Sequence, residues 1–372
     1  MKKIFVDIYL SFNLGDDLFL DILSKKYPNS EITVNYVGSN YDKFISKYKN
    51  IKRRKYTLFN KVYQKLGIKD YLTDYESISK EYDALVFIGG SIFREEEYHE
   101  SLYKDRMKMV RAFNEKNKPI FIMGSNFGPY KTEKFLNEYR EFYKLCTDVC
   151  FRDLYSYNLF KDLKNVRYAP DIVFQMDTSK YKENIKNNTI GYSIIDVRHK
   201  DGLSKYYNKY VDSTVKSIEI VTSKGYECLL MSFCENEGDL KVIKDITSKL
   251  SIDTLNKVKI YEYNGNLEES ISIISQLKLF VAARFHANIL GLLCDVGIIP
   301  VIYSQKTSNM LKDINLDSIL LDMDNLDKLY DMNIIESGIK NKINLESIAI
   351  EAKRQFEKLN EFENLKQGKV VN

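Results

Sequence analysis

Residues 277–306 read LKLFVAARFHANILGLLCDVGIIPVIYSQK, and this stretch decides the fold. The apolar run at 277–283 predicts a β-strand, residues 286–295 predict a helix, and residues 298–304 predict a second strand. A strand, a helix and a further strand in close succession are typical of a βαβ unit, in which both strands run parallel. The stretch therefore indicates an open α/β sheet.

Three basic side chains follow the strands predicted in this stretch. Arg284 and His286 lie in the turn between the first strand and the helix, and Lys306 follows the second strand. In an open α/β sheet, ligands bind beyond the carboxyl ends of the strands and beside helix N-termini. We therefore expect these three side chains to converge on a small anion that carries several charges.

The same alternation of strand and helix runs through the rest of the chain. Residues 176–188 interrupt it, because they are polar and lack an apolar period, which indicates a linker. We expect an α/β protein with two doubly wound, mostly parallel, Rossmann-like domains that face a cleft. The predicted boundaries are 1–176 for the N-terminal domain, 177–188 for the linker, 189–344 for the C-terminal domain, and 345–372 for a polar C-terminal helix and tail.

The composition is that of a soluble globular protein, with 44% hydrophobic and 29% charged residues among 372. The 56 basic and 52 acidic residues nearly balance, which argues against a nucleic-acid partner. The apolar N-terminus is broken by Asp7, and no uncharged apolar run of about 18 residues follows, so we expect neither a signal peptide nor a membrane span. The five cysteines lack metal-type spacing and fit buried thiols in a reducing cytoplasm.

One segment departs from this balance. Residues 49–65 read KNIKRRKYTLFNKVYQK, a basic stretch with interleaved aromatic residues. Such a segment can lie on the anionic inner face of the plasma membrane, and the alternative is a solvated excursion of the first domain. Both interpretations stay open at this point.

Small residues mark two further strand ends in the first half. Asn13 and Gly15 lie between the first predicted strand and its helix, where Asp16 is a natural N-cap. The predicted strand at 84–88 ends in Gly89-Gly90-Ser91, whose backbone amides can cradle an anion, although the pattern is neither a P-loop nor a full dinucleotide fingerprint. For Gly15-Asp16, a simple strand-to-helix turn with a cap is the alternative interpretation.

A third group combines small, polar and charged residues. Residues 124–129 read GSNFGP, and a rigid loop of this kind with Ser125 and Asn126 suits sugar hydroxyls. Arg152 follows another predicted strand and can bind a carboxylate or phosphate, or form an internal ion pair with Asp153 or Asp171. Asp171 can orient a cation, accept a proton or cap a helix.

The three histidines differ in their surroundings. His99 and His199 lie among charged residues, and we expect both to face solvent. His286 instead begins an apolar helix beside an arginine at a strand end, a setting that favours a functional role over a structural one.

Taken together, these residues resemble the polysaccharide pyruvyltransferase family. The motifs that carry the resemblance run in order along most of the chain: Gly15-Asp16, Gly89-Gly90-Ser91, Gly128-Pro129, Arg152-Asp153-x-x-Ser156, Pro170-Asp171, Arg284-Phe285-His286-Ala287, Gly297-x-x-Pro300, Tyr303 and Lys306. The family commonly continues its last strand as Tyr-Asp-x-Lys, whereas this chain has Tyr303-Ser304-Gln305-Lys306 and lacks the aspartate.

The resemblance implies a fold similar to the two-domain, GT-B-like glycosyltransferase architecture. It also implies transfer of pyruvate from phosphoenolpyruvate to two hydroxyls of one sugar in a cell-surface polysaccharide or its precursor, with release of phosphate. The product is a cyclic ketal, and the acceptor is a sugar or a lipid-linked oligosaccharide. Phosphoenolpyruvate is the co-substrate, and neither a metal nor another cofactor is called for.

The resemblance distributes roles between the two domains. His286 is the expected general acid or base, with Arg284 and Asp171 as further catalytic residues. The expected donor-binding residues, which contact phosphoenolpyruvate, are Arg152, Arg284, Lys306, Gly89, Gly90 and Ser91. The expected acceptor-binding residues, all in the predicted N-terminal domain, are Asn13, Gly15, Asp16, Ser125 and Asn126.

Two other functions remain open. A nucleotide-sugar glycosyltransferase of the same architecture needs an acidic residue on the ribose, and Asp295 or Glu235 could serve. A non-catalytic assembly factor that binds a glycan precursor is the other alternative. The oligomeric state cannot be predicted from the sequence.

Overall fold

The computed structural model describes residues 1–67, 70–181 and 184–365. Contacts divide the chain into two compact units. The first unit comprises residues 1–9, residues 19–172 and the segment from Ile350 onward. The second unit comprises residues 10–18 and 173–349.

This division differs from the predicted ranges at both ends of the chain. Residues 10–18, predicted as part of the N-terminal domain, group with the second unit, and the C-terminal segment groups with the first. The predicted linker includes residues 182–183 and the predicted tail includes residues 366–372, all of which lie outside the described residues. The division between the units falls within the first helix, after Leu18.

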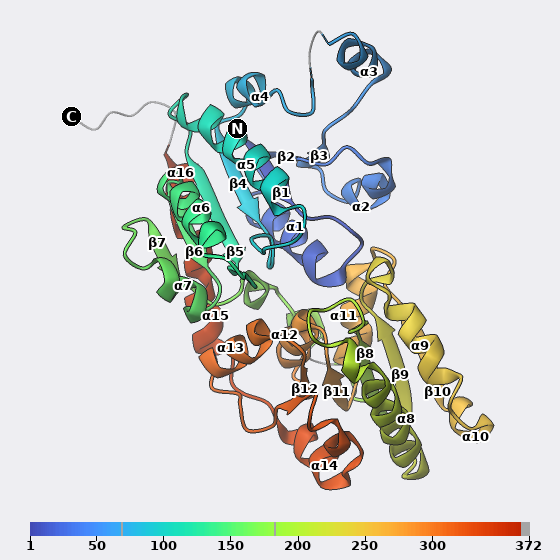
Figure 1. Ribbon diagram of the computed structural model, residues 1–372. Coiled ribbons are helices and arrows are strands. Elements are labelled where there is room, and N and C mark those ends of the chain that lie inside the picture. Colours follow the sequence, from blue (N-terminus) through green and yellow to red (C-terminus); the bar gives the residue numbers. More distant parts are fainter. Residues whose placement is uncertain (68–69, 182–183, 366–372) are drawn as a thin grey trace. The chain divides into compact units, whose positions relative to one another are not determined.

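The first unit contains a seven-stranded sheet in which every pairing is parallel (Figure 1). The strand order is β3-β2-β1-β4-β5-β6-β7, so the winding reverses between β1 and β4. The strands are β1 (Lys3–Ile8), β2 (Glu31–Val34), β3 (Ile51–Arg53), β4 (Ala84–Ile88), β5 (Ile120–Ser125), β6 (Asp148–Phe151) and β7 (Val166–Tyr168). The strand predicted from the apolar run before Gly89 coincides with β4.

The second unit repeats this topology with six parallel strands in the order β10-β9-β8-β11-β12-β13. The strands are β8 (Thr189–Ile194), β9 (Glu227–Ser232), β10 (Val258–Glu262), β11 (Leu279–Ala282), β12 (Gly297–Ile302) and β13 (Leu321–Asp322). The winding reverses between β8 and β11. In doubly wound sheets, ligands bind beside the carboxyl ends of the strands at this reversal.

Helices connect the strands. Those of the first half are α1 (Leu14–Lys26), α2 (Asp42–Ile45), α3 (Leu58–Lys65), α4 (Tyr75–Glu81), α5 (His99–Asn114), α6 (Glu133–Lys144) and α7 (Leu154–Phe160). Those of the second half are α8 (Tyr207–Ser223), α9 (Asp239–Thr247), α10 (Ile252–Leu255), α11 (Leu267–Ser275), α12 (Phe285–Leu293), α13 (Gln305–Asp313), α14 (Met332–Lys340), α15 (Glu346–Ala352) and α16 (Glu357–Asn364). None of the helices within the described residues is both long and apolar enough to cross a bilayer.

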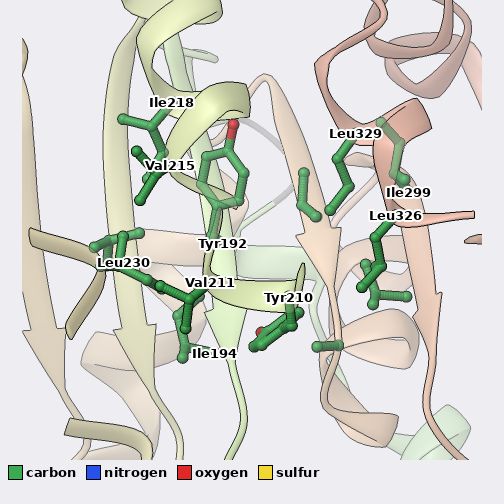
Figure 2. Close-up of a cluster of buried hydrophobic side chains, with 14 of the residues drawn as sticks. Tyr192, Ile194, Tyr210, Val211, Val215, Ile218, Leu230, Ile299, Leu326 and Leu329 are labelled. Carbon is green, nitrogen blue, oxygen red and sulfur yellow. The ribbon is translucent and has the colours of Figure 1, made fainter. Parts of the chain in front are cut away.

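The core of the second unit follows from the two-residue period of its strands. Tyr192 lies on the face of β8 that α8 covers, and Figure 2 shows Val211, Val215 and Ile218 of α8 beside Tyr192 and Leu230. The Tyr192 hydroxyl lies 3.0 Å from the Ser217 hydroxyl, so this buried phenol keeps a hydrogen-bond partner. Figure 2 also shows Leu326 and Leu329 next to Ile299 of β12 in the same core.

The core of the first unit is unusually aromatic. Phe127, from the loop after β5, lies with its ring centroid 4.9 Å from that of Phe160, and it also packs on Phe135 and Tyr139. Edge-to-face contacts of this kind add to the apolar area that the rings bury. The loop at 124–129 is therefore anchored by its aromatic residue.

The polar helix predicted after residue 344 is not continuous, because a 3-10 turn at Lys353–Phe356 separates α15 from α16. The turn carries the fully buried Gln355. Its side-chain oxygen accepts from the Gly124 amide at 2.8 Å, and its nitrogen donates to the Ala169 and Pro170 carbonyls. This one amide ties the C-terminal segment to the ends of β5 and β7.

Gly297, the first residue of β12 and of the motif Gly297-x-x-Pro300, lies against the end of α14. A Cβ at this position would lie 2.3 Å from the Ile339 carbonyl oxygen and 2.4 Å from that of Gly338. These are backbone atoms at the end of α14, so they cannot move aside as a flexible side chain would.

We predict that Gly297→Ala lowers the free energy of unfolding by about 1–3 kcal/mol, because it overpacks the contact between β12 and α14. Chemical denaturation followed by circular dichroism measures the change. Glu336→Ala, at an exposed position of the same helix, is the matched control and should stay within about 0.5 kcal/mol of wild type. Equal stability of wild type and Gly297→Ala would contradict the close approach.

Candidate functional site

Arg284 ends the turn after β11, at the point where the winding of the second sheet reverses. Its Nη1 donates to Glu237 Oε2 at 2.7 Å, and its Nη2 donates to Asp239. The backbone amide of Arg284 donates to the Ser193 hydroxyl at 3.1 Å, which links the turn to the end of β8. The guanidinium is buried and holds two carboxylates from the segment after β9.

The pKa values of these two carboxylates shift in opposite directions. Burial raises the pKa of Asp239, and the charge of Arg284 only partly offsets this, although Asp239 also accepts the Phe233 and Cys234 amides at 2.9 Å. Burial also acts to raise the pKa of Glu237. Here the charges of Arg284, Lys200 and Lys306 outweigh burial and hold the pKa of Glu237 well below its usual range. Glu237 is therefore the carboxylate that faces several cations.

His286 lies in the first turn of α12 and is buried. Its ring packs edge-on against Phe285 at 5.0 Å and rests on the backbone of Gly15, where a Cβ would come within 1.9 Å of His286 Nδ1. Gly15 is thus the residue at which the start of α1 meets the imidazole. A glycine is required there because any side chain would occupy the position of the ring.

Asn13 connects this contact to the ion network. Its side-chain oxygen accepts from the Gly15 amide at 3.0 Å, and its side-chain nitrogen donates to Glu237 Oε1 at 3.1 Å. The prediction that Asp16 is the N-cap is wrong, because Asn13 precedes α1 and caps it. Asp16 instead lies half-buried in the first turn of α1.

Lys306 follows β12, as expected, and lies in the first turn of α13. Its ammonium is 5.9 Å from the Phe285 ring centroid and 6.0 Å from that of Tyr303. Its charge contributes to the low pKa of Glu237. In the second unit, Arg284 and Lys306 therefore lie near Glu237, and Asn13 and Gly15 connect His286 to them. We call these residues, with Asp239, the Glu237 cluster.

The remaining predicted residues form a separate network in the first unit. Arg152 Nη1 donates to Asp171 at 2.7 Å, and Nη2 donates to the side-chain oxygen of Asn126 at 2.7 Å. Of the two interpretations of Arg152, the internal ion pair with Asp171 is the one formed. A Cβ at Gly90 would lie 2.6 Å from Arg152 Nη1, so the guanidinium rests on the backbone of Gly90.

The small residues of the two glycine turns complete this network. The Ser125 hydroxyl donates to the Gly89 carbonyl at 2.6 Å, and the Ser91 hydroxyl donates to the Asn126 side-chain oxygen at 3.1 Å. Gly89 has φ 144°, a conformation that side chains disfavour. Ser125 and Asn126 are buried and satisfied within the unit. Their contact with an acceptor sugar stays a prediction, as does convergence of Arg152 with the cations of the second unit.

Several sequence expectations need revision. His99 is half-buried rather than solvent-facing, because its ring packs on Phe135 at 5.3 Å, whereas His199 is exposed as expected. Asp295 lies between α12 and β12, at the amino end of that strand, and pairs with Lys342 at 3.2 Å. It is therefore unsuited to contact a ribose at the carboxyl edge of the sheet.

All five cysteines are buried and unbridged, as expected.

Glu237 and Asp239 are residues of the candidate site that could not be singled out from the sequence. They flank Gly238 soon after the end of β9, so the available signal was a pair of acidic residues at a further strand end. Their partner could not be predicted, because Arg284 lies more than forty residues further along the chain.

Comparison with known proteins places this chain in a family. Residues 13–305 match the family described as polysaccharide pyruvyl transferase. The amylovoran biosynthesis protein AmsJ of Erwinia amylovora is 20% identical over 286 residues, which cover 71% of this chain and 67% of AmsJ. Both matches support a transferase that acts on polysaccharides.

Solved structures share the fold. HepE of Anabaena, solved with UDP and glucose, is 12% identical with a TM-score of 0.58, and the match covers 98% of this chain and 99% of HepE. The UDP-GlcNAc 2-epimerase of Neisseria meningitidis, solved with UDP-GlcNAc, is 11% identical with a TM-score of 0.59, and the match covers 97% and 100%. These likenesses confirm the predicted α/β, GT-B-like fold class. The family match includes every residue of the Glu237 cluster except Lys306, which is the residue directly after the end of the match. Because this match spans most of the sequence, the chain belongs to the polysaccharide pyruvyl transferase family.

Proposed function

We propose that this protein transfers the pyruvyl group of phosphoenolpyruvate to two hydroxyls of one sugar, forming a cyclic ketal and releasing phosphate. The observation that supports it is the gathering of Arg284, His286 and Lys306 at the reversal point of the second sheet. Phosphoenolpyruvate carries a carboxylate and a phosphate, and such a cluster suits an anion of that kind.

Arg284 and Lys306 have different roles in the proposed site. Both terminal nitrogens of Arg284 are already bonded to carboxylates, so its main role is to neutralise Glu237 and Asp239 and to hold the turn before His286. Lys306 is half-buried with its ammonium above an aromatic face, and we assign it the direct contact with the donor. Arg284, Lys200 and Lys306 together outnumber the two carboxylates, which leaves a net positive charge for an anion.

The chemistry needs one proton donor and one acceptor. Protonation of C3 of the enol makes C2 electrophilic, the first sugar hydroxyl adds to C2 and loses its proton, and the bond from C2 to the phosphate oxygen breaks. The second hydroxyl then adds to C2 and loses its proton. Of the two hydroxyl protons, one replaces the proton delivered to C3 and the other leaves with phosphate. We assign His286 as the general acid and base that handles these protons.

Asp16 is a better candidate than Asp171 to orient the acceptor. Asp171 is fully buried and bonded to Arg152, whereas Asp16 is half-buried and adjoins Gly15, on which His286 rests. Lipid-linked or free oligosaccharides are both acceptable acceptors, and no metal or further cofactor enters the scheme.

Donor choice tests the proposal against a nucleotide-sugar transferase. Phosphoenolpyruvate alone should raise the melting temperature of the protein. Phosphate should be released from phosphoenolpyruvate only when an acceptor glycan is also present. UDP-GlcNAc and UDP-glucose should do neither. Stabilisation by the nucleotide sugars alone would instead favour the glycosyltransferase alternative, and glycan binding without use of any donor would favour the assembly factor.

We predict that His286→Gln lowers kcat for phosphate release by about 10²–10⁴-fold, because the general acid and base is lost. His199→Gln changes an exposed histidine of the same unit and should retain wild-type turnover. Circular dichroism melting shows whether each variant is folded. Turnover of His286→Gln at the wild-type rate would remove this residue from the mechanism.

Gly15→Ala should reduce kcat on the order of 10²-fold, because its methyl group displaces the imidazole that rests on Gly15. The effect should vanish in a His286→Gln background, since Gly15 acts only by positioning that ring. Phosphate-release kinetics of the two single variants and the double variant measure this coupling. Additive losses would show that Gly15 has a role of its own.

Lys306 and Arg284 should respond differently to neutralisation. Lys306→Gln should raise KM for phosphoenolpyruvate and leave the melting curve unchanged. Arg284→Gln should weaken donor use and also destabilise the protein by about 3–5 kcal/mol, because Asp239 is then buried without a countercharge. Donor titrations and denaturation curves of both variants provide the test. An unchanged KM in both would count against the proposed donor site.

A further inference from the structure

α3 is an amphipathic helix whose apolar side chains are exposed. It begins after Thr57, whose hydroxyl caps the Asn60 amide at 3.3 Å, and it ends at Lys65. None of its residues is buried. The apolar residues on it and at its C-cap have exposed fractions of 78% for Leu58, 76% for Phe59, 55% for Val62, 42% for Tyr63 and 65% for Leu66.

These apolar residues share one side of the helix. At about 100° per residue, the five positions fall within an arc of roughly 140°, and the four polar residues of α3 occupy the rest. The polar residues are Asn60, Lys61, Gln64 and Lys65. A single exposed leucine needs no explanation, but a continuous apolar face on an exposed helix marks an interaction surface.

The charge around this face is one-sided. Residues 43–67 contain nine lysines and arginines and no acidic residue, in a chain whose charges otherwise nearly balance. Some are committed within the unit, since Lys52 pairs with Glu31 and Arg53 pairs with Asp42. The exposed cations that remain on or beside α3 are Lys55, Lys61 and Lys65.

We infer that α3 docks this protein on an anionic phospholipid surface. The apolar face would insert at the level of the headgroups, while Lys61 and Lys65, with long stems on the polar side, would reach the phosphates. The charged residues of α3 are all cations, so its apolar face and its charges together match an anionic lipid surface. This inference is independent of the proposed reaction, because α3 lies in the first unit and outside the Glu237 cluster.

A tryptophan reporter tests the docking directly, since the natural chain has no tryptophan. Phe59→Trp should show a blue-shifted, stronger emission with vesicles of phosphatidylcholine and phosphatidylglycerol, and no change with phosphatidylcholine alone. Added salt should weaken the response. Ile252→Trp is the matched control, because Ile252 is 80% exposed on α10 of the other unit, and its emission should not change.

Co-sedimentation separates the apolar contribution. Leu58→Ser/Val62→Ser should reduce the vesicle partition coefficient about tenfold or more, whereas Ile252→Ser/Leu255→Ser should bind as wild type does. All four positions are exposed, so the melting temperature should be unchanged. The inference is overturned if wild type does not bind these vesicles, or if Leu58→Ser/Val62→Ser binds equally well. It is also overturned if the wild type self-associates through α3 without vesicles, which analytical ultracentrifugation detects.

Discussion

The buried ion network of Arg284, Glu237 and Asp239 is the interaction on which the candidate site depends. Charges taken out of water are costly unless they are paired, and here one guanidinium meets two carboxylates beside the reversal point of the sheet. The network joins the turn before His286 to the segment after β9, and through Asn13 it reaches the start of α1. His286 is thereby held against Gly15, with a defined ring position.

Both units place functional candidates at equivalent points of equivalent sheets. Gly89 and Gly90 follow β4, and Arg284 follows β11, each next to the strand at which the winding reverses. Their local chemistry differs, because Arg152 is closed by Asp171 and Asn126, whereas the second cluster has Lys306 in addition to its ion network. The net positive charge of the second cluster supports the proposal that the donor binds to the second unit. An exposed amphipathic α3 would also suit an enzyme whose acceptor is linked to lipid.

Much of the fold could be predicted because buried parallel strands read as short apolar runs, as in β4, and because strand ends meet at one edge of a sheet. The contacts that could not be predicted from the sequence are those between segments far apart in the chain. The pairing of Arg284 with Glu237 and Asp239 depends on how separate segments fold together, which no local pattern records. Residues 10–18 follow the first strand, yet they pack with the second unit. Likewise, Arg152 had two possible partners in sequence, and only side-chain packing selected Asp171.

In the proposed reaction, the Glu237 cluster serves pyruvyl transfer. Mass spectrometry of an acceptor oligosaccharide, incubated with the protein and phosphoenolpyruvate in heavy water, tests it most directly. The account predicts a product that carries one ketal-linked pyruvate, with a deuterium delivered to the C3 methyl group. An oligosaccharide that gains a hexose from a nucleotide sugar, and nothing from phosphoenolpyruvate, would contradict it.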